Sequence, residues 1–204
     1  AGDKTCVAQW TINQYTISFN SDGGSEVADI TQDYGTAVTA PAAPTKEGYT
    51  FIGWYPPVPQ TMPAEDKNCV AQWRINQYTI RFNTDGGSQV ADITQDYNTA
   101  VTAPTAPTKE GYTFNKWDPP VPQTMPAGDK TCVAQWNINR YTISFNTDGG
   151  SEVNSITQDY GTAVTAPAAP SKTGYTFNKW EPPVPQTMPA GDKTCLAQWT
   201  INQY

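Results

Sequence analysis

The chain contains no histidine, and its 12 lysine and arginine residues are outnumbered by 19 aspartate and glutamate residues, which gives a net charge of -7 at pH 7. Without histidine, an imidazole general base, a histidine-containing triad and a histidine metal ligand are excluded. The shortage of basic side chains argues against nucleic acid or an anionic membrane surface as a partner. No run of 18 apolar residues occurs, so we expect no insertion into a membrane.

One unit of sequence is repeated along the chain. Cys6, Cys69, Cys132 and Cys195 lie 63 residues apart, and the register holds without insertion or deletion. We place repeat 1 at 15–77, repeat 2 at 78–140, and repeat 3 with the first residue of another copy at 141–204. Residues 1–14 are interpreted as the closing strand of a truncated preceding repeat.

A 63-residue unit is close to the lower size limit of a domain with its own core. The single cysteine in each unit excludes a disulfide within a repeat. Apolar side chains must therefore stabilise it, and aromatic residues are frequent in every copy.

Alternating apolar and polar residues predict strands within each unit. In repeat 1 the expected strands are 15–20, 48–54 and 69–73, and the glycines of 22–24 suit a tight hairpin turn. Residues 27–38 are ambiguous, and we favour extended structure with at most one helical turn. The prolines of 40–44 exclude regular structure, and 56–59 suit polyproline II. The sequence predicts a mainly β fold.

The junction between repeats contains neither glycine nor proline from Thr5 to Asp22, so it does not have the composition of a flexible linker. Its apolar phase changes midway: Trp10 and Ile12 are even-numbered, whereas Tyr15 is odd-numbered. Successive side chains of a strand point to opposite faces. We therefore expect one nearly continuous strand to serve two cores, with stiffly joined modules, a large rotation between neighbours and an elongated array.

An ordered series of short motifs recurs in all three repeats. In repeat 1 it consists of YTISFN at 15–20, DGGS at 22–25, PTKEGYTF at 44–51, Trp54, MPA at 62–64 and AQW at 71–73. The series resembles the Listeria–Bacteroides repeat family, the type that includes the B-repeat of internalin B. The resemblance implies a β-grasp-like module whose helix is reduced or absent, found in tandem in bacterial surface and secreted proteins such as adhesins and internalins. It implies no catalytic residue, and it departs from the family at the four cysteines, where a larger aliphatic residue is more usual.

The four cysteines raise the possibility of a metal or redox site. Zinc sites need clustered ligands, with paired cysteines two to four residues apart. Cys6 instead shares its strand phase with Ala8 and Trp10. We interpret the cysteines as small core residues, except for Cys6, whose partner strands would belong to the truncated repeat.

Two carboxylate pairs, Asp29 with Asp33 and Glu65 with Asp66, could in principle perform acid–base chemistry. Ser155 replaces Asp29 in the third copy, and glycine replaces Glu65 in both other copies, which favours solvated loop charges. The turn at 22–24 supplies one carboxylate only, too few for a calcium loop. No catalytic, cofactor-binding or metal-binding residue is therefore predicted.

Aromatic residues offer a second kind of candidate site. Tyr49, Phe51 and Trp54 could form a platform for stacking sugars, but aromatics at strand spacing favour a core. The prolines of 56–59 could bind an adaptor domain, yet their recurrence in every copy favours a strap over the module's own aromatics.

These observations predict a non-enzymatic spacer or stalk of a bacterial surface or secreted adhesin-like protein. The location would be extracellular or at the cell surface, with any export signal outside these residues. The alternative is a weak multivalent binding module for a host protein or glycan. The orphan strand with Cys6, Ala8 and Trp10 could also pair with another chain.

Overall fold

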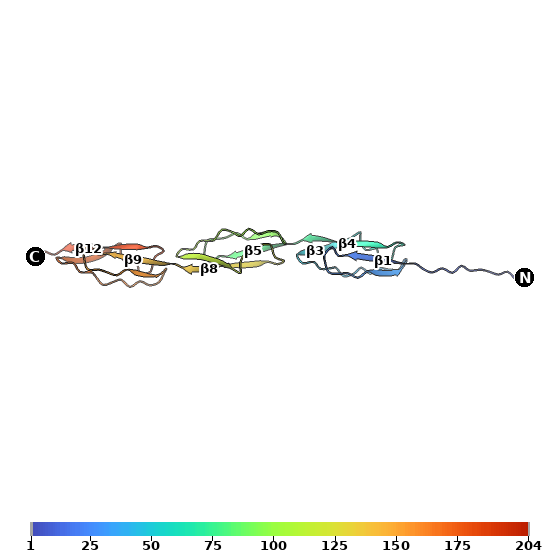
Figure 1. Ribbon diagram of the computed structural model, residues 1–204, viewed down its shortest axis with the longest axis horizontal. Helices are drawn as coiled ribbons and strands as arrows, with labels where there is room; N and C mark the ends of the chain where they lie inside the picture. The colour runs from blue at the N-terminus through green and yellow to red at the C-terminus, as the bar shows by residue number, and fades with distance from the viewer. Residues whose placement is uncertain (1, 204) are drawn as a thin grey trace. The chain divides into compact units, whose positions relative to one another are not determined.

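The structure, a computed structural model, describes residues 2–203. This range contains twelve strands and no helix, and the strands form three four-stranded sheets, one in each repeat (Figure 1). We call the repeats with their sheets modules 1, 2 and 3. The prediction of a mainly β tandem array is confirmed.

The strands have the same order and lengths in each module. Module 1 contains β1 (Gln14–Asn20), β2 (Ile30–Asp33), β3 (Tyr49–Tyr55) and β4 (Lys67–Ile75). Module 2 contains β5 (Gln77–Asn83), β6 (Ile93–Asp96), β7 (Tyr112–Asp118) and β8 (Lys130–Ile138). Module 3 contains β9 (Arg140–Asn146), β10 (Ile156–Asp159), β11 (Tyr175–Glu181) and β12 (Lys193–Ile201).

The first and last strands of a module lie side by side in the centre of its sheet. The strand order is β2-β1-β4-β3 in module 1, β6-β5-β8-β7 in module 2 and β10-β9-β12-β11 in module 3. In modules 1 and 3 the central pair is parallel, and both outer strands run antiparallel to their neighbours. This is the β-grasp arrangement implied by the resemblance, with extended chain in place of the helix.

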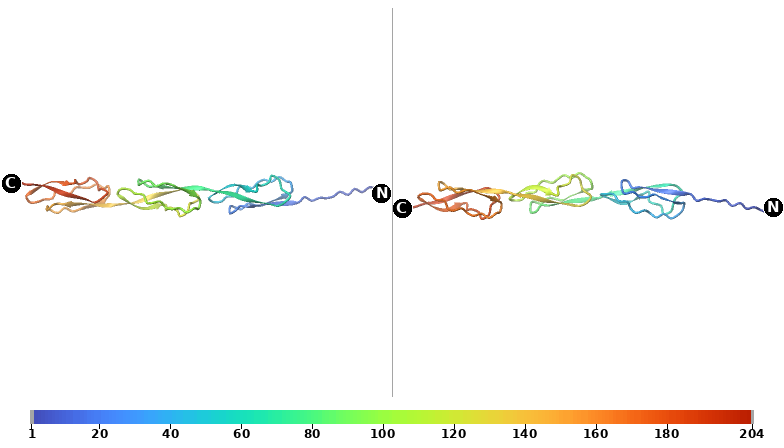
Figure 2. Two further views of the ribbon diagram at one scale, coloured as in Figure 1. Left: turned by 90° about the horizontal axis from the view of Figure 1, so that it is seen from above. Right: turned by 60° about the horizontal axis from the view of Figure 1, so that its bottom comes forward.

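The chain divides into two compact units that do not coincide with the modules. One unit holds the chain up to Ile80 together with Ile93–Val101 and Pro122–Lys130. The other holds Arg81–Asp92, Thr102–Val121 and the chain from Thr131 onwards. Each junction between two modules therefore lies within one unit. Figure 2 shows the sheets from two further directions.

Each core is made from the residues of its own module. In module 1, Ile17, Met62 and Cys69 are at most 1% exposed, and Val58 packs against them. In module 3, Ile143, Met188 and Cys195 occupy the equivalent positions. The predicted core role of Cys69, Cys132 and Cys195 is therefore confirmed, and Val58 is the residue of 56–59 that packs on the core.

A β-bulge interrupts the pairing of the third and fourth strands in every module. In module 1 it lies between Phe51 and Gly53, so that Ile52 is displaced from the ladder and is 61% exposed. Asn115 and Asn178 take the same exposed position. The exchange of isoleucine for asparagine between copies is explained by this exposure.

Two local features, the turn at 22–24 and the proline segment, differ from the sequence-based expectations, whereas residues 27–38 are extended as expected. Residues 22–24 make a turn with positive φ at Asp22 and Gly23, but they do not close a tight hairpin. Only the first half of β1, Gln14–Ile17, pairs with β2, and the second half, Ile17–Asn20, pairs with β4. Residues 27–38 contain the strand β2 and no helical turn. The proline segment begins with a cis bond at Tyr55–Pro56.

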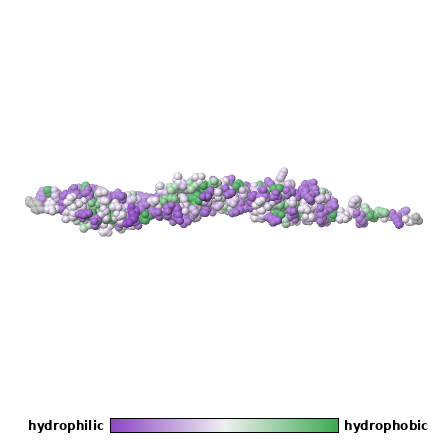
Figure 3. Space-filling model, viewed as in Figure 1, coloured by the Kyte–Doolittle hydropathy of each residue, from purple (hydrophilic) through white to green (hydrophobic). Residues whose placement is uncertain are grey.

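Residues 2–13 also differ from the expected closing strand, since they form no strand and are exposed (Figure 1). The equivalent strand β4 is held between β1 and β3, whereas residues 2–13 belong to none of the three sheets of the described chain. Val7 is 74% exposed and Trp10 92% exposed. Figure 3 shows the hydrophobic residues of this segment in green.

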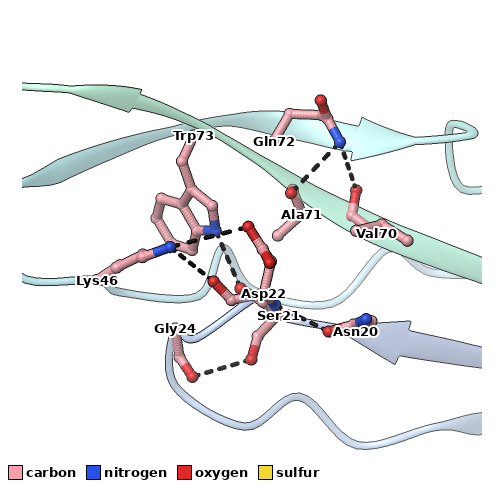
Figure 4. Close-up of polar contacts among 9 residues, drawn as sticks. All are labelled: Asn20, Ser21, Asp22, Gly24, Lys46, Val70, Ala71, Gln72 and Trp73. Carbon is pink, nitrogen blue, oxygen red and sulfur yellow. Dashed lines mark hydrogen bonds and ion pairs between the residues drawn. The ribbon is translucent and has the colours of Figure 1, made fainter.

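A lysine fastens the 21–24 turn, or its equivalent, to the sheet in every module, and Figure 4 shows this contact in module 1. In module 1, Lys46 Nζ donates to Asp22 O at 2.7 Å and lies 4.7 Å from the Tyr49 ring centroid and 5.6 Å from that of Trp73. Trp73 Nε1 donates to Ser21 O at 3.0 Å. The turn is therefore fixed by a cation–π contact and by hydrogen bonds to its carbonyl groups.

Lys172→Met is expected to lower the stability of module 3 by about 1 kcal/mol, because it removes the cation–π contacts with Tyr175 and Trp199. Lys179→Met is the matched control, since Lys179 is 64% exposed and pairs only with Glu181. Urea unfolding followed by tryptophan fluorescence measures both. Equal losses for the two variants would contradict the role assigned to Lys172.

Candidate functional site: the junctions between modules

Of the carboxylates considered for acid–base chemistry, Asp29 and Asp66 accept hydrogen bonds from the backbone. Asp33 and Glu65 accept them from the side chains of Gln14 and Lys67. Asp29 accepts a hydrogen bond from Phe19 N at 3.2 Å, and Asp66 accepts one from Thr16 N at 2.8 Å. The bond of Asp66 recurs as Asp129 with Thr79 and as Asp192 with Thr142. Lys67 donates to Glu65 and lowers the pKa of its carboxyl group. These side chains cap strand ends and loops.

The aromatic residues of module 1 are engaged with one another. Phe51 makes edge-to-face contacts with Trp54 and Trp73 at centroid distances of 5.3 and 5.5 Å, and Phe19 contacts Trp54 at 4.9 Å. The same network recurs in modules 2 and 3. In module 2, an open groove of about 430 Å³ lies beside it, lined by Ala103, Phe114, Lys116, Trp117, Pro120 and Val121.

The cysteines hold no metal cluster: within residues 2–203 no group of three or more potential ligands is found. Cys69, Cys132 and Cys195 are 0% exposed, whereas Cys6 is exposed. Burial raises the pKa of the Cys69 and Cys195 thiols, because it disfavours the charged thiolate.

A thiol reagent applied without denaturant at pH 7–8 is therefore expected to modify Cys6 alone. Burial blocks access to the other three thiols, and the raised pKa keeps Cys69 and Cys195 protonated. Peptide mapping by mass spectrometry identifies the labelled residue, and addition of urea should release the remaining three thiols. Rapid labelling of Cys132 in the folded chain would contradict the core assignment.

A single residue separates one module from the next, and it is hydrogen-bonded to both. Asn76 follows β4 directly and precedes β5 directly. Its backbone N donates to Gly48 O at 2.9 Å, and its Oδ1 accepts from Thr50 Oγ1 at 2.6 Å. Both contacts hold it to module 1.

The same residue is also held to module 2. Asn76 O accepts a hydrogen bond from Tyr97 N at 2.8 Å, and its Nδ2 donates to Tyr78 Oη at 3.3 Å. Asn76 thus makes two hydrogen bonds to each module, which restrict the conformational freedom that a flexible linker would have.

A tyrosine and a glycine close the junction beside Asn76. The ring of Tyr97 lies directly against Gly48, where a Cβ atom would overlap the ring carbons. Gly48 is buried and has φ +75°, a conformation that favours glycine. The Tyr97 ring also meets Tyr49 edge to face at 6.1 Å.

The junction between modules 2 and 3 repeats this arrangement. Asn139 N donates to Gly111 O, Tyr160 N donates to Asn139 O, and Thr113 Oγ1 donates to Asn139 Oδ1, at 2.9, 2.9 and 2.6 Å. Tyr160 lies against Gly111 and meets Tyr112 at 6.0 Å. Two independent junctions thus have one geometry.

The equivalent tyrosine of module 1 and the equivalent glycine of module 3 do not face another described module. Tyr34, equivalent to Tyr97, is 53% exposed and contacts Tyr15 of its own module. Gly174 is equivalent to Gly48, but a Cβ atom placed on it would have no other atom within 4 Å. Tyr175 is 39% exposed. The tyrosine–glycine contact therefore requires two adjacent modules.

The sequence analysis did not identify the residues of the junction. The change of apolar phase pointed to the region between β4 and β5, whereas Asn76, Gly48 and Tyr97 were not singled out. A signal existed, since all three residue types are identical in every copy. An open cleft of about 580 Å³ accompanies the first junction, with Arg74, Asn76 and Asp96 in its lining.

No helix among the described residues is long and apolar enough to cross a membrane. The polar groups of Asn76 and Asn139 join adjacent modules.

Comparison with known proteins agrees with the motif series. A family model described as the Listeria-Bacteroides repeat domain matches residues 15–66, 78–119 and 141–182. A putative Gly-rich membrane protein of Evansella cellulosilytica is 36% identical over 98% of this chain and 26% of its own length. Internalin H of Listeria monocytogenes is 39% identical over 54% of this chain and 21% of its own length.

A second putative membrane protein of Evansella cellulosilytica is 34% identical over 98% of this chain and 34% of its own length. The chain thus spans about a third or less of the length of the curated relatives that it matches. A solved structure of domains 3–4 of the streptococcal high identity repeats in tandem, from a cell surface protein, aligns at 21% identity and a TM-score of 0.24, covering 62% of this chain and 98% of that one.

Proposed function

From the premise that the chain belongs to the Listeria-Bacteroides repeat family, we propose that it is a non-enzymatic spacer in an exported bacterial surface protein. Its role is to hold the parts of the protein on either side of it at a distance set by the number of modules. The observation that carries the proposal is the junction, where a single hydrogen-bonded asparagine replaces a flexible linker.

The junction supports this function because a spacer needs resistance to bending. Rotation about Asn76 would break hydrogen bonds to both modules and withdraw the Tyr97 ring from Gly48. Hydrogen bonds and ring contacts each contribute of the order of 1 kcal/mol. Together they oppose bending at the junction.

The proposed location, extracellular or at the cell surface, is supported by similarity to a putative membrane protein and to internalin H. An adhesin-like role for the whole protein is part of the same proposal. Module boundaries at 15–77, 78–140 and 141–204 fit the sheets, since each range contains one set of four strands apart from the first residue of β1, β5 or β9.

Small-angle X-ray scattering tests the spacer directly. The expected result is a maximum dimension that increases by a constant amount when a fourth 63-residue copy is added. Tyr97→Ala with Tyr160→Ala should broaden the distribution of distances. Tyr34→Ala is the control because the Tyr34 ring packs on Tyr15 of its own module. A compact particle in the unaltered chain would exclude the proposal.

The groove beside Trp117 supports a second candidate, a weak multivalent binding module for a host protein or glycan. Modules 2 and 3 share Phe114/Phe177, Trp117/Trp180 and Lys116/Lys179 there, whereas Gly53 replaces the lysine in module 1. A glycan array with chains of one, two and three modules tests it. Binding that increases with module number and is lost in Trp117→Ala with Trp180→Ala would favour this candidate.

Pairing between chains through Cys6, Ala8 and Trp10 is a further proposal, supported by the exposure of this segment. Sedimentation at increasing concentration tests it. Association that persists after residues 1–12 are removed would exclude this segment as the contact.

A further inference from the structure

We infer that each module is a tension-bearing link whose central strand pair is loaded in shear when the chain is pulled along its length. This goes beyond a spacer that keeps a distance, and it does not depend on what the chain is attached to. It rests on the path of the chain through each sheet.

The chain enters a module on its first strand and leaves it on its last. In module 1 these strands, β1 and β4, are parallel neighbours with the register Ile17↔Lys67 to Asn20↔Val70. Because they are parallel, the entry at Gln14 and the exit at Ile75 lie at opposite ends of the pair. A pull on the chain therefore slides β1 and β4 past each other along their length.

Shear differs from peeling in how it loads the hydrogen bonds. Under shear the bonds of the parallel ladder share the load and must fail together, whereas peeling breaks them one after another. Forced unfolding is governed by the barrier to the first opening step. The shear arrangement raises that barrier without any addition to equilibrium stability.

The central pair carries further contacts that oppose sliding. Ser18 Oγ donates to Lys67 O at 3.3 Å and to Asn68 Oδ1 at 3.2 Å. Ile17 and Cys69 on the two strands are 0% exposed, so water is kept from that face of the ladder, and hydrogen bonds in such surroundings are stronger than in water.

Module 3 repeats the design, with β9 and β12 parallel from Ile143↔Lys193 to Asn146↔Leu196. Asn139 alone separates β8 from β9, so tension passes from one module to the next without a compliant linker. The outer strands β10 and β11 lie outside this load path.

Single-molecule force spectroscopy on the whole chain with two attachment points tests the inference. The N-terminus is held in both cases, and Cys6→Ser removes the exposed native thiol. In one chain the second attachment uses Gln203→Cys, beyond β12, which loads all three modules in shear. In the other it uses Gly191→Cys, where an added Cβ meets nothing within 4 Å.

An attachment at residue 191 pulls on the start of β12, which lies beside the start of β9, and module 3 is then peeled. After the folded separation of the pulled points is subtracted, its opening lengthens the chain by about 175 Å, nearly the same as for a whole module. The event is therefore identified as the one low-force opening in each trace, which the Gln203→Cys chain lacks. We expect module 3 to open at a severalfold lower force than in the Gln203→Cys chain, while modules 1 and 2 keep the force of that chain.

Opening of module 3 at the same force from both attachment points would overturn the inference. So would opening of all modules at the low peeling force. Neither outcome bears on scattering from the unloaded chain, so failure of this inference is distinguishable from failure of the spacer proposal.

Discussion

Gly111→Ala is expected to loosen the junction between modules 2 and 3, whereas Gly174→Ala, at the equivalent position of module 3, leaves every junction intact. The two glycines share their backbone conformation, with φ +77° and +78°, and their carbonyl groups accept equivalent hydrogen bonds from Asn139 N and Asn202 N. They differ in their surroundings, since only Gly111 lies under a tyrosine ring.

Both substitutions place alanine in the left-handed region, which costs about 1–2 kcal/mol. Only Gly111→Ala also brings its Cβ into the Tyr160 ring. The atoms it meets are Cγ, Cδ1 and Cε1, on the side of the ring close to the backbone, so a small rotation of the side chain does not relieve the overlap. The ring must leave the junction.

Distance distributions between labels at Asn115 and Asn178 measure the effect, because both positions are exposed and lie in adjacent modules. The unaltered chain and Gly174→Ala should give one narrow distribution, and Gly111→Ala a broad one. Adding Tyr160→Ala to Gly111→Ala should remove the extra loss of stability, with a coupling energy of about 0.5–3 kcal/mol. Equal broadening in both glycine variants would show that strain alone, without the ring contact, controls the junction.

The sequence predicted those features that depend on neighbouring residues. The alternation of 15–20 gave β1, and the phase change between Trp10 and Tyr15 predicted that one module ends where the next begins. The cysteine phase placed Cys69 in the core. Each of these follows from side chains two residues apart on one strand.

Features that depend on distant partners could not be predicted from local patterns. The turn at 22–24 suggested a tight hairpin, but the second half of β1 pairs with β4, about fifty residues further along the chain. The ambiguous segment 27–38 contains Tyr34, whose equivalent Tyr97 packs on Gly48 of the preceding module. When a residue packs against another repeat, its position does not follow the apolar periodicity of its own repeat.

Ile17→Ala is expected to unfold most of module 1 and to leave module 3 folded. Ile17 is 0% exposed, and removal of a buried isoleucine side chain typically costs about 2–5 kcal/mol. A core of this size rarely supplies more than about 3–5 kcal/mol, so the loss is comparable with the whole stability of the module. Ile52→Ala is the matched control, since Ile52 is 61% exposed, and it should change stability by less than about 0.5 kcal/mol.

The buried thiols report each module separately. In Ile17→Ala, Cys69 should react with a thiol reagent without denaturant, while Cys195 stays protected because its core contains residues of module 3 only. Continued protection of Cys69 would contradict the core assignment of Ile17. Simultaneous exposure of Cys195 would show instead that the junctions couple the modules into one cooperative unit. Since Asn76 and Tyr97 join modules 1 and 2, the degree of exposure of Cys132 then measures how far one module depends on its neighbour.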